Sequence, residues 1–307
     1  MDATTHASLA NPPARFRAFF ADARVFQIVF LGSLLAAGAL LRDFSVRPVQ
    51  VALTFSAALT AQHVDWWLNP LKPRSYRSAL ITSLSLALLL RAENFFAHPL
   101  AASAAISSKG IFRIRGKHLF NPATFGIIFA LTTLPGVWVS PGQWGNDVAL
   151  AGWLFVLGTV VTQRARRGGI SFAFLGFYLG AIALRVAYLG QPWGVWTHQL
   201  QSGALLLFAF FMISDPMTAP NHPRGRIAHA GVVATAAFAW QYEFYFTNGL
   251  IWALFIASPA VAPWDVIWPA PKFEWKAQGG NDEETKDAGV GRRGIRSDDA
   301  RGIRRAA

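Results

Sequence analysis

The 307-residue chain contains no cysteine and few charged residues. Without thiolates it can form neither disulfides nor cysteine-ligated metal or iron–sulfur sites. Only 14% of its residues are charged and 53% are hydrophobic, whereas soluble domains carry roughly 25% charged residues. It also lacks a glycine-rich phosphate loop, a zinc-binding helix motif and a nucleophile elbow, so no catalytic or metal-ligating residue is predicted. This composition favours a chain embedded in a lipid bilayer.

Ten apolar segments are candidates for membrane-spanning helices, each of which needs roughly 20 residues. They lie near residues 25–41, 49–67, 78–91, 97–112, 122–139, 148–163, 170–189, 200–213, 227–243 and 247–263. Segments 78–91 and 200–213 would form helices of only roughly 21 Å, which is typical of half-helices that break near the midplane. The sequence predicts an all-α polytopic membrane protein with about ten transmembrane helices.

Basic residues are distributed unevenly between alternate loops. With both termini inside, fifteen Lys and Arg residues before residue 270 lie in cytoplasmic segments, and four lie outside, namely Arg42, Arg47, Arg91 and Arg185. Cytoplasmic loops of membrane proteins carry such an excess, which accounts for the net charge of +12 without a nucleic-acid partner. We therefore expect a multi-pass protein of the inner (plasma) membrane with both termini in the cytoplasm.

Three regions follow from this layout. Residues 1–23 are predicted as a cytoplasmic N-terminal segment, residues 24–270 as the membrane domain, and residues 271–307 as a disordered cytoplasmic tail. Beyond residue 276 the tail holds almost no apolar side chains and cannot bury enough surface to fold. The N-terminal segment lacks the apolar stretch and cleavage site of a signal peptide, so the first span is expected to remain as an uncleaved anchor.

Short apolar runs recur along the chain. Residues 78–92 pair with 202–216, and residues 121–135 pair with 249–263, at offsets of 124 and 128 residues. Each offset covers five predicted spans, and an odd number of spans inverts the second half relative to the first. The pattern predicts two inverted five-helix repeats with a site near the midplane.

The first polar break precedes the segment 122–139. Asn121 suits a helix N-cap and Pro122 a first helical position, with Lys117 upstream and Thr124 in the first turn. Free N–H groups, the positive end of the helix dipole and a lysine can together hold an anionic or carbonyl group of a ligand. An ordinary capped helix with a snorkelling lysine explains the same residues equally simply.

A second polar break follows the short run 200–213. Asp215 and Pro216 stop the helix sharply, and Thr218 follows. Asp215 is a candidate to accept hydrogen bonds from a ligand such as a flavin ring, because an ionisable residue at the membrane edge is a functional candidate. A loop cap at the cytoplasmic surface is the alternative.

Two further polar groups receive simpler interpretations. His63 and Asp65, near the inner end of the second span, are interpreted as part of an interfacial belt rather than a cofactor or proton site. Residues 168–169, a glycine pair after the basic run 164–167, are interpreted as a turn.

Three segments resemble, in order and spacing, the RnfD membrane proteins of Rnf-type electron transport complexes and the related NqrB proteins of Nqr complexes. They are 78–126, ending in KHLFNPATFG, then 210–226, FFMISDPMTAPNHPRGR, and 249–265, GLIWALFIASPAVAPWD. The resemblance implies two inverted five-helix halves, bound flavin, and electron transfer coupled to sodium or proton movement beside partner subunits. Together with the helix-start argument, it gives a predicted cofactor-binding set of Lys117, Asn121, Pro122, Thr124, Asp215, Pro216 and Thr218.

One departure from the family concerns covalent flavin. Family members carry FMN on a threonine in an outer loop, but the corresponding loop here, residues 139–147, has no threonine. The predicted cofactor is therefore non-covalent FMN or riboflavin. The expected partners are the lipid bilayer, other electron-transport subunits or a cytoplasmic reductase, which would make the chain part of a membrane oxidoreductase. The alternatives are a transporter or channel for a small molecule, flavin included, on the same fold, and a scaffold whose tail recruits a soluble reductase.

Overall fold

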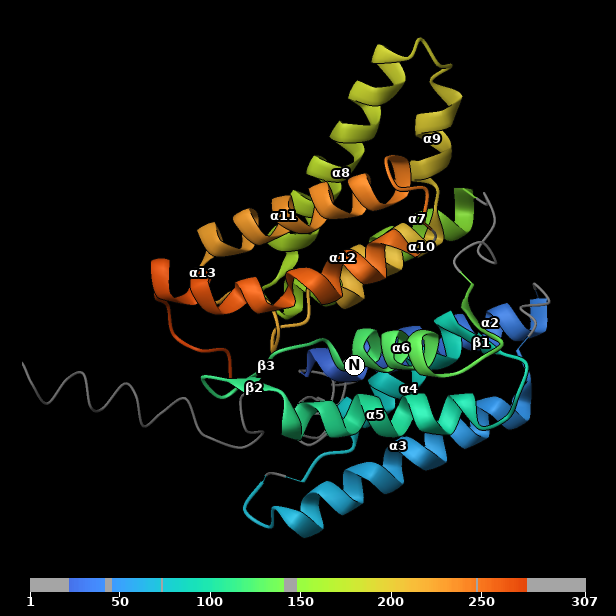
Figure 1. The fold of residues 1–307 in the computed structure, drawn as a ribbon, viewed down its shortest axis with the longest axis vertical. Helices are drawn as coiled ribbons and strands as arrows, with labels where there is room; N and C mark the ends of the chain where they lie inside the picture. The colour runs from blue at the N-terminus through green and yellow to red at the C-terminus, as the bar shows by residue number, and fades with distance from the viewer. Residues whose placement is uncertain (1–21, 42–45, 73, 141–147, 247, 275–307) are drawn as a thin grey trace, which may run out of the picture. The chain divides into compact units, whose positions relative to one another are not determined.

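The computed structural model describes residues 22–41, 46–72, 74–140, 148–246 and 248–274 (Figure 1). The part up to residue 139, called the first half below, contains helices and short strands in the order α2 (Ala23–Leu41), α3 (Pro48–Leu68), α4 (Arg77–Leu89), β1 (Leu90–Ala92), α5 (Ala97–Ile111), β2 (Arg113–Ile114), β3 (Lys117–His118), α6 (Pro122–Thr133) and β4 (Val137–Val139).

The second half, from residue 148 onward, is helical throughout its regular elements. It contains α7 (Val148–Arg164), α8 (Gly168–Tyr188), α9 (Gly194–Leu200), α10 (Gly203–Leu207), the π-helix η2 (Phe208–Met212), α11 (Pro223–Tyr242), α12 (Gly249–Ala257), the 3₁₀-helix η3 (Ser258–Ala260) and α13 (Val261–Ile267). Each of the ten predicted apolar segments overlaps one or more of the observed helical elements, and α9 is an additional helix.

The helices of each half pack mainly on one another. In the first half α5 packs between α3 and α6, and α4 contacts α2, α3 and α6. In the second half α11 packs on α8 and α12, while α10 and η2 pack on α7. The halves touch where α12 lies on α6 and α2 lies on α7, so one continuous apolar core runs through both (Figure 1).

Small residues allow a close helix contact in the first half. A Cβ atom added to Gly126 of α6 would lie 2.5 Å from the carbonyl oxygen of Ala101 and 2.9 Å from the Cβ of Ala105, both on α5. Such small-residue contacts are characteristic of helix pairs in membranes, where van der Waals packing drives association. This contact holds α6 against α5, and α6 begins at the candidate site.

Two helices of the first half stop short and continue as extended chain, so the prediction of a purely α-helical protein was incomplete. After α4 and α6, strands β1 and β4 pair antiparallel, with Leu90 opposite Val139 and Ala92 opposite Val137. The predicted span 122–139 is helical only as far as Thr133. Its helix ends because Leu134 precedes a proline and adopts an extended conformation (φ −122°, ψ 134°). Pairing the two extended ends satisfies backbone groups that lipid could not.

Fewer helical stretches are long and apolar enough to cross a membrane than the sequence predicts. Within the described residues, three helical stretches are long and apolar enough to cross a membrane: Ala23–Leu40, Gly168–Tyr188 and Gly249–Ile267. Arg77–Leu89, Pro122–Thr133 and Gly203–Met212 are apolar but shorter. The chain is thus a helical protein with membrane-spanning candidates, whereas ten spans and an inverted repeat remain predictions. Residues 1–21 and 275–307, which hold nearly all of the predicted terminal segments, lie outside the described residues.

Candidate functional site

The start of α6 has the predicted cap. Asn121 is the N-cap residue, with extended backbone (φ −60°, ψ 126°), and its side-chain oxygen accepts a hydrogen bond from the Thr124 N–H at 3.1 Å. Pro122 occupies the first turn, where its missing N–H costs nothing. The Thr124 hydroxyl also lies 3.4 Å from the same oxygen and is fully buried. The local sequence therefore fixes the orientation of the Asn121 amide.

The second polar break meets this cap. Asp215 follows η2 and accepts a hydrogen bond from the Met217 N–H at 3.0 Å, which closes a turn after the helix. The Asn121 amide nitrogen donates to the other Asp215 carboxylate oxygen at 3.3 Å and lies 3.4 Å from the Met212 carbonyl oxygen. The Thr218 hydroxyl is 3.4 Å from the Asp215 carbonyl oxygen. The two breaks, 94 residues apart, thus form one contact between the halves.

Lys117 makes the second contact between the halves. Its ammonium group donates to the Ala219 carbonyl oxygen at 2.6 Å and to the Asp265 carboxylate at 2.8 Å, and it lies 3.3 Å from the Asn221 side-chain oxygen. The other Asp265 oxygen accepts from the Asn221 N–H at 2.7 Å. Lys117, Asn121, Asp215, Asn221 and Asp265 together are called the polar junction below.

Electrostatics within the polar junction reflect burial. The side chains of Lys117 and Asp265 are only 7% and 9% exposed. Burial lowers the pKa of Lys117, and the Asp265 carboxylate opposes that shift. Burial raises the pKa of Asp215, against the Met217 N–H and the nearby Lys109 charge. An ammonium group has three donors, and all three of Lys117 are engaged inside the protein. Lys117 therefore positions its neighbours and has no donor left for a ligand.

A pocket opens beside the Lys117–Asp265 pair. It encloses about 270 Å³, its open mouth included, between the β2–β3 hairpin and the η3–α13 segment. The hairpin turns through Arg115 and Gly116, which both have positive φ (52° and 76°), as a two-residue turn between antiparallel strands requires. The pocket is lined by Ile114, Arg115, Lys117, His118, Leu119, Ser258, Val261, Ala262 and Asp265.

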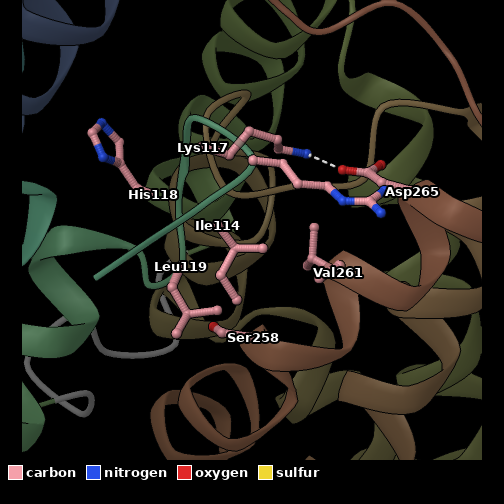
Figure 2. A pocket seen from close by; sticks show the side chains of 9 residues that line it. Ile114, Lys117, His118, Leu119, Ser258, Val261 and Asp265 are labelled. Carbon is pink, nitrogen blue, oxygen red and sulfur yellow. Dashed lines mark hydrogen bonds and ion pairs between the residues drawn. The ribbon is translucent and has the colours of Figure 1, made fainter. Parts of the chain in front are cut away.

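Apolar and polar groups share the pocket wall. Figure 2 shows Ile114, Leu119 and Val261 gathered near the Ser258 hydroxyl, and Lys117 reaching across to Asp265. An apolar wall with a few convergent polar groups is the usual composition of a small-molecule site. The pocket can thus take an uncharged, partly apolar group that hydrogen-bonds through one edge.

An aromatic cluster lies next to the pocket in the chain. It consists of Phe112, Phe120, Phe125 and Phe255. Phe120 and Phe255 stack with their ring centroids 4.6 Å apart, and Phe112 lies 5.2 Å from Phe125. Phe120 follows a pocket residue directly, and Phe255 precedes Ser258 by about one helical turn. Since none of the four rings is fully buried, the cluster offers an aromatic surface at this end of the protein.

The structure brings together the polar residues of the predicted site. Lys117, Asn121, Thr124, Asp215 and Thr218 all take part in the network around the polar junction, but only Lys117 also lines the pocket of Figure 2. Asn121 and Asp215 bind each other, and their role towards a cofactor stays a prediction. Of the residues given a simpler interpretation, Asp65 pairs with Lys72 at 2.8 Å and accepts from the Asn69 amide, so it closes a loop.

Two residues of the polar junction were not predicted as site residues. Asp265 closes the last apolar segment, and an acidic residue at the end of a span is itself a functional signal. Asn221 gives no such signal, because a loop asparagine is common. The glycine pair 168–169 was also misread, since it begins α8 and the turn lies at Ala165–Arg166, where Arg166 has φ 54°.

Comparison with known proteins gives partial matches. None of the established protein-family profiles matches the chain. The chain is 30% identical over 121 residues to the D subunit of the ion-translocating oxidoreductase complex of Haemophilus influenzae, and 32% identical over 121 residues to that of Klebsiella pneumoniae. A similar protein from Vibrio vulnificus is 30% identical over 119 residues. These matches cover 39% of the chain and about a third of each relative's length, 32% in Haemophilus and Vibrio and 33% in Klebsiella. Over that part, the chain is similar to the D subunits of ion-translocating oxidoreductase complexes.

Proposed function

We propose that this chain is a membrane subunit of an electron-transport system of the ion-translocating oxidoreductase type. In this proposal it works beside other electron-transport subunits, is linked to ion transport, and binds a flavin non-covalently in the pocket between the β2–β3 hairpin and α13. The observation that carries the proposal is the similarity to the D subunits of such complexes, whose names describe that activity. The pocket beside the polar junction supports the flavin-binding part of the proposal.

The pocket chemistry supports a flavin ring. The ring system is flat and largely apolar, and it carries hydrogen-bonding groups along one edge. Ile114, Leu119 and Val261 supply an apolar wall, while Ser258 and Asp265 supply a hydroxyl and a carboxylate. The pocket has an open mouth. One edge of a flavin can therefore enter it while the rest of the molecule stays outside.

The residues of this chain would bind and tune the cofactor. A bound flavin supplies reversible one- and two-electron chemistry. Lys117 holds Asp265 in place, so that the carboxylate accepts a hydrogen bond from a donor entering the pocket without shifting.

Absorption spectroscopy of the purified protein tests the proposal. The full chain is purified in mild detergent and its spectrum recorded before and after flavin is added and free flavin is removed. Bound oxidised flavin is expected to give two absorption bands, one in the near-ultraviolet and one in the blue. A preparation that is colourless and stays colourless after flavin addition would refute flavin binding. Flavin uptake into proteoliposomes without any redox partner would instead favour a transporter.

A pair of substitutions tests the placement. Val261 lines the pocket and is buried, whereas Val266, also on α13, is 56% exposed. Val261→Trp fills the pocket and is expected to lower flavin affinity at least roughly tenfold, a change of about 1.4 kcal/mol. Val266→Trp adds the same side chain outside the pocket and should bind flavin as the unaltered protein does. Equal binding by both variants would place the flavin elsewhere and leave the function itself standing.

A further inference from the structure

The residue that precedes α8 carries a buried guanidinium group that forms no ion pair with any described residue. Arg167 precedes Gly168, and only 5% of its surface is exposed. Among the described residues, no carboxylate pairs with it, although Asp215 and Asp265 lie close enough to act on its charge. Burial and the neighbouring Arg226 lower the pKa of Arg167 to about 10, so the group is still cationic at neutral pH. Asp215 and Asp265 thus offset part of this charge from a distance, but neither makes a direct ion pair with the group.

Three buried polar atoms around this turn have no hydrogen-bond partner among the described residues. They are Nε of Arg167, Oγ of Ser171 and Nε of Arg226. Ser171 is fully buried and stands four residues after Arg167, on the same face of the helix start. Arg226 belongs to the same place, because its other nitrogens donate to the carbonyl oxygens of Arg166 and Asn221 at 3.0 and 3.3 Å. Buried donors without acceptors in a folded protein indicate a missing acceptor.

The chemistry of these donors identifies the acceptor. All three can donate, two belong to guanidinium groups, and the backbone N–H groups at the start of α8 add the positive end of a helix dipole. The Phe273 ring lies 5.1 Å from the guanidinium carbon of Arg167 and covers one flat side, which leaves the in-plane N–H groups for a second partner. Planar guanidinium donors match the oxygens of phosphate in two-point contacts.

We propose that Arg167, Ser171 and Arg226 form a phosphate-binding site at the start of α8. The site takes a phosphate group carried either by a soluble ion or ester or by the headgroup of an anionic phospholipid. The site stands independently of flavin binding, since its residues do not line the pocket of Figure 2.

Thermal unfolding of the full chain in maltoside micelles tests this site and separates its two sources. In one arm inorganic phosphate is titrated against chloride at matched ionic strength. In the other, phosphatidylglycerol is added to micelles in phosphate-free buffer. We expect the unfolding temperature of the unaltered protein to rise in at least one arm, and the responding arm identifies the source. No rise in either arm overturns the proposal.

Matched variants locate the effect. Arg167→Gln is expected to weaken binding roughly 10-fold or more, whereas Arg166→Gln removes the same charge from an exposed neighbour and should leave binding within about 2-fold. If Arg167→Gln does not fold, Ser171→Ala removes one donor without changing charge and should weaken binding roughly 3- to 10-fold. Responses that are the same in all the folded variants would mean that the ion acts elsewhere, and the site would be rejected.

Discussion

Replacing Lys117 by methionine is expected to destabilise the protein strongly. The substitution keeps the apolar stem and removes the ammonium group, which makes an ion pair of 2.8 Å with Asp265 and a hydrogen bond of 2.6 Å to the Ala219 carbonyl oxygen. Both charged side chains are less than 10% exposed. Methionine would therefore leave the Asp265 carboxylate buried without its cation.

The size of the effect follows from that burial. Removing one partner of a buried ion pair costs about 3–5 kcal/mol, because the remaining charge keeps its desolvation penalty. The expected loss in the free energy of unfolding of Lys117→Met is in this range. Equilibrium unfolding in mixed micelles, followed by tryptophan fluorescence, measures it. Trp264, the residue before Asp265, gives a signal close to the change.

A less buried ion pair provides the control. Lys72 and Asp65 are also 2.8 Å apart, but their side chains are 30% and 23% exposed. Lys72→Met should cost at most about 1 kcal/mol, since water replaces the lost partner. The double variant Lys117→Met with Asp265→Asn removes both charges and keeps an oxygen for the Asn221 N–H. It should lose less than the sum of the single variants. Equal losses for Lys117→Met and Lys72→Met, or strict additivity in the double variant, would refute the reasoning.

Two further predictions concern packing and pH. Gly126→Ala would place a Cβ 2.5 Å from the Ala101 carbonyl oxygen and should cost about 1–3 kcal/mol of unfolding free energy, whereas Gly180→Ala meets nothing within 4 Å and should be neutral or stabilising by up to about 1 kcal/mol. Burial and the neighbouring Lys109 charge lower the pKa of His118 to about 4, from 6.5. Because the unfolded chain takes up this proton near pH 6.5, the stability due to neutral His118 should be lost as pH falls from about 6.5 towards 4. His118→Asn should flatten that part of a plot of unfolding temperature against pH, and an unchanged slope would contradict it.

Local features of the structure were predictable from the sequence. The cap at Asn121 and the stop at Asp215 depend on residues within a few positions along the chain, and the structure has both. The helical segments were also predictable, because each is a long apolar run of consecutive residues. The observed helix ends differ from the predicted ones where proline or glycine interrupts the helix. Leu134, for example, precedes Pro135 and ends α6 earlier than predicted.

Pairings between distant residues were not predictable in this way. Lys117 lies 148 residues from Asp265, and Asn121 lies 94 from Asp215. Each residue separately fits a capped helix or a loop, and the residues next to it in the sequence do not indicate its distant partner. The same limit hid Arg167, whose significance depends on burial and on the absence of a paired carboxylate among the described residues, two properties that a single sequence does not display.

The polar junction also bears on how such a protein can work. A transporter that alternates access by moving one half against the other would have to open or close at the end where the halves meet. There, the Lys117–Asp265 ion pair, the Lys117 bond to Ala219 and the Asn121–Asp215 bond all cross between the halves. Separating them would break a buried ion pair and two hydrogen bonds in every cycle, which costs free energy. A protein that holds a cofactor still between electron donor and acceptor has no such cost and gains from the rigidity. The junction thus counts against a rocking transport cycle and is consistent with the proposed electron-transport function.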